Sequence, residues 1–152
     1  MDGFIKAFIR ASLLWFTLGI TFGIAMAVHP AWIAFRPAHA HATVVGFLTM
    51  LVFGVGYQLL PRLFGHPLHS RRLAVAHLYC ANAGLAAMVG GFVTQVYAAE
   101  RGQAILVAGG VTFAAGVLMW VYNLWRTFDA ADARHKPRPP GTARPLPTLG
   151  DD

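Results

Sequence analysis

Acidic side chains are almost missing from this sequence. Only six of the 152 residues are Asp or Glu, and the stretch from Gly3 to Ala99 contains none. This absence excludes paired-carboxylate hydrolysis and EF-hand calcium binding within that stretch, together with most magnesium and non-heme iron sites. The single cysteine, Cys80, excludes an intramolecular disulfide, a thiolate zinc site and covalent CxxCH heme attachment.

Charge of either sign is scarce. Charged residues make up 12% of the chain and hydrophobic residues 57%, whereas a soluble domain carries about 25% charged residues. The formal net charge of +6 would suit nucleic acid, but no basic helix interleaves with base-stacking aromatic side chains. We therefore expect a membrane protein that contacts the lipid bilayer and binds no nucleic acid.

Four uncharged stretches are long enough to cross roughly 30 Å of hydrocarbon as helices. They are residues 11–29, 39–61, 73–97 and 104–125, and the connections between them are short. The sequence therefore predicts an all-α, integral membrane four-helix bundle over residues 1–130. Residues 131–152 contain five of the nine prolines and several basic residues, which predicts a disordered cytoplasmic tail.

The basic residues predict the orientation in the membrane. Only two of the twelve, Arg36 and Arg101, lie on one side of the membrane. The positive-inside rule places the side that is rich in Lys and Arg in the cytoplasm, so the side with these two is the outer one. The other ten lie on the opposite side, so we expect both termini to be cytoplasmic and the protein to be a multi-pass protein of the inner membrane. Residues 25–27 (AMA) resemble a signal-peptide cleavage site. The apolar run before them is long for a signal peptide, so we expect the first span to stay in the protein. The ten are Lys6, Arg10, Arg62, Arg71, Arg72, Arg126, Arg134, Lys136, Arg138 and Arg144.

Histidines are the informative polar side chains. His29, His39 and His41 lie at the outer ends of the first two spans, where an ionisable residue is a candidate functional group. Residues two apart on an α-helix point to nearly opposite faces, so His39 and His41 of one helix cannot coordinate the same metal ion. They can serve two separate sites, or pair with imidazoles from elsewhere. From the residues alone, heme, a copper site that includes His29, and structural interface histidines all stay open.

Small residues accompany these histidines. Ala40, Ala42 and Gly46 do not project far from the helix. A helix surface without bulky side chains suits a flat macrocycle lying against it. Gly19 and Gly23 form a GxxxG pair, which indicates close helix packing within the bundle or at a subunit interface.

The other histidines suggest structural roles. His66 and His69 flank Pro67 in a loop, where we expect solvation. His77 lies one turn into the third span, and we interpret it as a hydrogen-bonded packing residue. It is too far from His39 and His41 to share an iron, because the second span is about 35 Å long.

The stretch HAHATVVGFLTMLVFGVGYQLLPRLFG, followed by LHSRRLAVAHLYCANAG, resembles the catalytic subunit of the heme–copper oxidase superfamily. It is most similar to the C-type (cbb-class) oxidases, with nitric oxide reductases as relatives. In that family a late helix begins with H-x-H, ends in a P-R-L-x-G-like turn, and leads to another helix with a histidine. The resemblance covers about residues 36–84, and the matching positions are His39, His41, Gly46, Gly54, Tyr57, Pro61, Arg62, Leu63, Gly65, Leu73 and His77.

The resemblance implies roles for these positions. His39 would be the proximal ligand of a high-spin heme, and His41 an axial ligand of the low-spin heme. Residues 36–39 (RPAH) also resemble the R-P-L-H opening of an early helix, whose histidine is the other low-spin ligand. The three copper-ligating histidines and the glutamate of the nitric oxide reductases have no counterpart here. The chain also has four helices, whereas the family subunit looks like three four-helix units around a pseudo-threefold axis.

We therefore expect an electron-carrying b-type cytochrome in place of a complete oxidase. Non-covalent heme b would be held by bis-His ligation through His39 and His41, with Arg36 pairing with the propionates. The pseudo-threefold resemblance suggests a homotrimer in which His39 of one protomer and His41 of its neighbour clamp a heme. A dimer ranks second, and His29 completing a site within one chain ranks third.

Two further hypotheses stay open, and the redox partner is not specified by the sequence. One is a reduced heme–copper-type unit that binds or reduces oxygen or nitric oxide at a five-coordinate heme. The other is a structural or assembly subunit of a respiratory complex, with copper at His29 and His39 or His41.

Overall fold

The computed structural model describes residues 2–135, and its regular structure over that range is entirely helical. Single helices form three spans: α1 (Gly3–Val28), α4 (Arg71–Gln95) and α5 (Ala99–His135). The second span joins four segments, namely the 3₁₀ turn η1 (Pro30–Phe35), α2 (Arg36–Ala40), the π-helix η2 (His41–Thr49) and α3 (Met50–Leu63). All four spans are long and apolar enough to cross a membrane. The predicted all-α fold with four membrane-spanning helices is confirmed.

The helices extend beyond the predicted spans at their charged ends. α1 begins at Gly3 and includes Lys6 and Arg10, and α5 continues to His135. Low charge marks only the part of a helix suited to hydrocarbon, whereas the backbone hydrogen-bond ladder continues where no residue breaks it. α5 therefore includes residues 131–135 of the predicted tail. Residues 136–152 lie outside the described part of the chain.

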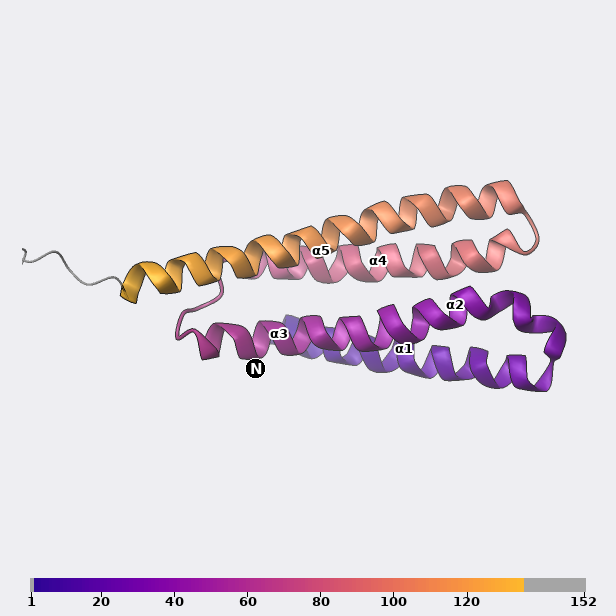
Figure 1. Ribbon diagram of the computed structural model, residues 1–152, viewed down its shortest axis with the longest axis horizontal. Helices are drawn as coiled ribbons and strands as arrows, with labels where there is room; N and C mark the ends of the chain where they lie inside the picture. Colours follow the sequence, from indigo (N-terminus) through magenta and orange to yellow (C-terminus); the bar gives the residue numbers. More distant parts are fainter. Residues whose placement is uncertain (1, 136–152) are drawn as a thin grey trace, which may run out of the picture.

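The four spans form two helical hairpins (Figure 1). α1 lies along the second span, α4 lies along α5, and the α4–α5 contact is the most extensive in the molecule. Glycines bring α4 and α5 together, because a Cβ atom at Gly109 would lie only 2.7 Å from the backbone nitrogen of Met88. Close van der Waals packing of this kind is what holds helices together in lipid. The N-terminus and the end of α5 lie toward the same end of the molecule (Figure 1).

Polar contacts fasten the second hairpin to the loop before it. The Ser70 hydroxyl caps α4 by accepting from the backbone N–H of Leu73 at 3.2 Å. The backbone N–H of Ser70 donates to Oδ1 of Asn123 at 2.9 Å, and Nδ2 of Asn123 donates back to the Ser70 carbonyl at 2.8 Å. Asn123 lies on α5, so this buried side chain ties the start of α4 to the last span.

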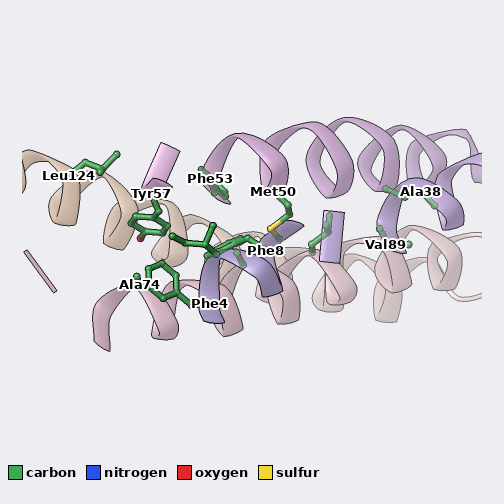
Figure 2. Close-up of a cluster of buried hydrophobic side chains, with 13 residues drawn as sticks. Phe4, Phe8, Ala38, Met50, Phe53, Tyr57, Ala74, Val89 and Leu124 are labelled. Atoms are coloured by element: carbon green, nitrogen blue, oxygen red, sulfur yellow. The ribbon is translucent and has the colours of Figure 1, made fainter. Parts of the chain in front are cut away.

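The core runs between the hairpins along the bundle, from Leu124 and Phe4 at one end to Ala38 and Val89 at the other (Figure 2). Phe4 and Phe8 pack against Phe53 and Tyr57 of α3 (Figure 2). Large apolar side chains on the outer surfaces stay exposed, among them Leu14 of α1 and Leu118 of α5. An apolar exterior is what a helix bundle presents to lipid.

The second span departs from the α-helix that the sequence predicts over 39–61. Residues 41–49 form a π-helix, a conformation found often at functional sites. Threonine side chains bond to the backbone here, because Oγ1 of Thr43 donates to the His39 carbonyl at 2.8 Å and Oγ1 of Thr49 to the Val44 carbonyl at 3.1 Å. The wider turn begins at His41, directly beside the H-x-H motif.

Candidate functional site

His39 lies on α2 and turns its half-buried imidazole toward α1. Its Nδ1 lies 2.8 Å from the backbone carbonyl oxygen of Gly19. One turn further along α1, a Cβ at Gly23 would lie 3.2 Å from Cε1 of the same ring. Gly23 therefore forms a notch for the His39 ring, and Gly19 makes room for Thr43, so both glycines of the GxxxG pair allow close packing inside the bundle.

His41 is the first residue of η2, and its imidazole faces a different helix. Its ring lies against Phe92 of α4 with centroids 4.6 Å apart. Its Nδ1 lies 2.9 Å from the backbone carbonyl oxygen of Pro37.

Both contacts specify the same tautomer. A carbonyl oxygen can only accept a hydrogen bond, so Nδ1 of each ring carries the proton and Nε2 keeps its lone pair. A histidine that binds a metal usually donates its other ring N–H to a carbonyl or carboxylate, which fixes the orientation of the ring. In His39 and His41, Nε2 is the ring nitrogen that these carbonyl contacts leave free.

The two imidazoles do not converge, as their spacing predicts. His39 contacts α1, whereas His41 contacts α4. Within residues 2–135, no three His, Cys, Asp or Glu side chains gather as a group that could hold a metal ion. A three-imidazole copper site built from His29, His39 and His41 is therefore not assembled by this part of the chain.

Arg36 and His29 lie at the same end as these histidines but outside the packed interior. Arg36 is exposed at the start of α2, one turn before His39, and its guanidinium makes no ion pair or hydrogen bond to the described residues. His29 is an exposed residue at the end of α1, and its ring lies 5.4 Å from that of Trp32. Among the described residues, no hydrogen bond, ion pair or ring contact joins either side chain to His39 or His41.

The surface expected to receive a macrocycle is mostly filled. Ala42 is fully buried, and a Cβ at Gly46 would lie 2.6 Å from Cβ of Trp15. Only Ala40 stays exposed. The expectation of a low surface at all three positions is wrong, because the bundle's own side chains occupy two of them. A flat group would instead meet this chain from outside, over the exposed face near Ala40.

His77 is the buried histidine, and its interpretation as a packing residue is confirmed. It is 0% exposed, its ring packs against Phe8 and Phe53, and its Nδ1 lies 3.1 Å from the hydroxyl of Tyr57. Its Nε2 is buried without a partner among the described residues. The sequence analysis missed Tyr57 as the partner; both positions match the family motif, but their spacing alone does not show the contact.

The loop histidines behave as expected for solvated residues. His69 is exposed, and Nδ1 of His66 lies 2.8 Å from the carbonyl of its neighbour Pro67. His66 therefore shares the tautomer of His39 and His41 without their place in a membrane span.

Comparisons with known proteins agree with these motifs. The family profile described as cytochrome c and quinol oxidase polypeptide I matches residues 4–142. The chain is 32% identical over 118 residues to the cbb3-type cytochrome c oxidase subunit CcoN1 of Stutzerimonas stutzeri. That match covers 61% of this chain and 25% of the relative, so the chain spans about a quarter of the length of that protein. No solved structure matches.

The family match covers nearly all of the described residues, including both hairpins and the H-x-H motif. With four helices that can span a membrane, the chain is a multi-pass protein of the inner membrane. It belongs to the cytochrome c and quinol oxidase polypeptide I family, the subunit I family of the heme–copper oxidases.

Proposed function

We propose that this chain is a membrane-embedded b-type cytochrome in which Nε2 of His39 and Nε2 of His41 ligate heme iron for electron transfer. The observation that carries the proposal is that Nδ1 of each ring lies on a backbone carbonyl, which leaves Nε2 as the nitrogen that could ligate the iron. The family supports heme binding in respiratory electron transfer. Bound heme would supply a one-electron iron couple.

The residues of the chain would set the orientation of the site. The carbonyls of Gly19 and Pro37 hold the two rings, and the notch at Gly23 leaves room for the His39 ring. Arg36 would neutralise a propionate, because its exposed guanidinium has no partner among the described residues.

The site needs a second chain. His39 and His41 face different helices, so neither can supply the opposite ligand to an iron held by the other within one chain. A homotrimer solves this geometry, because a ring-closing contact lets His39 of one protomer and His41 of its neighbour clamp one heme at each interface. The exposed surface at Ala40 supports such an arrangement, since the inner positions are filled.

The first experiment is an absorption spectrum of the purified protein after heme-replete expression. Two imidazoles on one iron give sharp low-spin bands and little carbon monoxide binding. A high-spin spectrum with carbon monoxide binding would instead identify a five-coordinate heme. Protein without heme bands would contradict the proposal and favour the structural or copper-handling subunit, which metal analysis of that preparation would test.

Variants then test the ligands. We expect His39→Ala and His41→Ala each to lose the low-spin bands. His66→Ala is the matched control, because its imidazole has the same carbonyl-bound Nδ1 but lies in a loop. Low-spin heme retained in both span variants would overturn the assignment.

Mass in detergent and the heme-to-protein ratio test the assembly. The trimer predicts three equivalent hemes for three chains. A monomer that keeps its heme and survives His29→Ala would exclude the trimer, while a dimer with half-filled sites would support the second-ranked arrangement.

A further inference from the structure

A cavity of about 300 Å³ lies at the N-terminal end of the bundle, far from the H-x-H motif. It is bounded by the first turn of α1, the last turns of α3 and the loop that leads to α4. Phe4, Ile5 and Leu68 give it an apolar side. The charged side contains Arg62 and Arg71.

The two guanidiniums are held by neighbouring side chains. With its amide placed to satisfy its hydrogen bonds, Gln58 accepts from Nη2 of Arg62 at 2.6 Å. Nη2 of Arg71 lies 2.7 Å from Oδ1 of Asp2. A guanidinium has five N–H donors in a planar fork, so both arginines keep donors for a further anion. Asp2 is the one carboxylate at the cavity.

The position of the cavity indicates the source of that anion. It lies where membrane-spanning helices begin and end, and the first turn of α4 contributes Arg71, with Arg72 next to it in the sequence. Basic pockets between transmembrane helices at this level bind anionic lipid head groups. A free phosphate ion would use only the charged side, whereas a phospholipid also uses the apolar side.

We propose that this cavity binds the phosphate of an anionic phospholipid between Arg62 and Arg71, and that Asp2 competes with the lipid for Arg71. The lipid's acyl chains lie along the apolar exterior of the bundle, and its phosphate accepts from the free guanidinium donors. Asp2 weakens the site, because it occupies Arg71 and adds a like charge.

The test is a titration of the purified full chain in neutral detergent, followed by native mass spectrometry. Phosphatidylglycerol and phosphatidylcholine with identical acyl chains are the two lipids. We expect retained adducts with phosphatidylglycerol and few with phosphatidylcholine. Each of Arg62→Gln and Arg71→Gln should weaken phosphatidylglycerol binding about fivefold, in line with about 1 kcal/mol per basic residue at an anionic surface.

Two variants control the result. Arg126→Gln removes the same charge from an exposed arginine of α5 that pairs with Asp129 at 3.9 Å outside the cavity, and it should leave binding unchanged. Asp2→Asn should tighten binding, which also guards against misfolding as the cause of any loss.

Three outcomes would overturn the proposal. Equal retention of both lipids would show that the net negative charge of the head group is not recognised. Equal losses of phosphatidylglycerol binding in Arg62→Gln and Arg126→Gln would show that binding depends on the net charge of the protein and not on the cavity. Full competition by inorganic phosphate at matched concentration would identify a small-anion site in place of a lipid site.

Discussion

The hydroxyl of Tyr57 lies 3.1 Å from Nδ1 of His77, and this contact joins the two helical hairpins inside the core. Tyr57 belongs to α3 of the first hairpin, and His77 to α4 of the second. Both side chains are buried. The pair thus contributes a polar, directional contact to an interface with a mainly aromatic and aliphatic core. A second hydrogen bond joins the hairpins where Nε1 of Trp15 on α1 donates to Oδ1 of Asn82 on α4 at 3.1 Å.

Removing His77 should weaken folding without changing the heme spectrum. His77→Ala deletes the hydrogen bond and leaves a cavity, so we expect a loss of about 3 kcal/mol in the free energy of unfolding. Tyr57→Phe keeps the shape and should lose about 1 kcal/mol. Unfolding in detergent measures both losses, and disappearance of the low-spin bands in His77→Ala would refute the separation of His77 from the heme site.

Filling the notch in α1 should displace the His39 ring. In Gly23→Leu the new side chain begins 3.2 Å from Cε1 of His39, a spacing tight enough that the ring must shift. We expect heme occupancy, measured as heme per chain, to fall severalfold. Gly110→Leu is the control, because a Cβ there meets nothing within 4 Å. Equal occupancy in the two variants would speak against the role of the notch.

Adding a methyl group between α4 and α5 should destabilise the second hairpin. A Cβ at Gly84 would collide with backbone atoms of Phe113 and Gly109, which cannot move without separating the helices. We expect Gly84→Ala to cost about 1–3 kcal/mol in unfolding free energy. Gly90→Ala meets nothing within 4 Å and should be neutral or slightly stabilising. The prediction fails if the two variants unfold alike.

Loss of the Asn123 amide should loosen the start of α4. Asn123→Ala removes both hydrogen bonds to Ser70 and leaves the part-buried N–H of Ser70 without its partner, at a cost of about 1–3 kcal/mol, whereas the Ser70 carbonyl keeps its bond from the N–H of Ala74. Gln103→Ala removes an exposed bond to Gln95 and should have a small effect. Hydrogen exchange at the first turn of α4 would show whether the loss of stability is located there. Protection equal to wild type at that turn would argue against a stabilising role of the Asn123–Ser70 hydrogen bonds.

Replacing Arg36 should speed heme loss while keeping the spectrum. Arg36→Gln removes the cation that we place beside a propionate, but it leaves both imidazoles in position. We expect severalfold faster heme transfer to an acceptor such as apomyoglobin, with unchanged low-spin bands. Arg101→Gln, the other basic residue predicted on the outer side, should release heme at the wild-type rate; a matching acceleration there would assign the effect to surface charge.

The motif of the candidate site was accessible from the sequence because its members are close together along one helix. Residues 36–41 carry the arginine and both histidines, and the two-residue spacing alone predicts that the rings diverge. The sequence did not show which ring nitrogen of each histidine stays free of the backbone. That depends on the Gly19 carbonyl, twenty residues away on α1, and on the Pro37 carbonyl. The filling of Gly46 by Trp15 was missed for the same reason.

The sequence by itself determined the four spans and the absence of regular structure other than helix in residues 2–135. In lipid no water bonds to backbone polar groups, and a helix satisfies them within a single uncharged run of this length. The tertiary structure decided which side chains of neighbouring spans contact each other. It placed Tyr57 on His77, turned His39 and His41 toward different helices, and widened the turn at His41 into a π-helix. Such contacts depend on how neighbouring helices fit, because lipid supplies no solvophobic force that would pick one packing from composition alone.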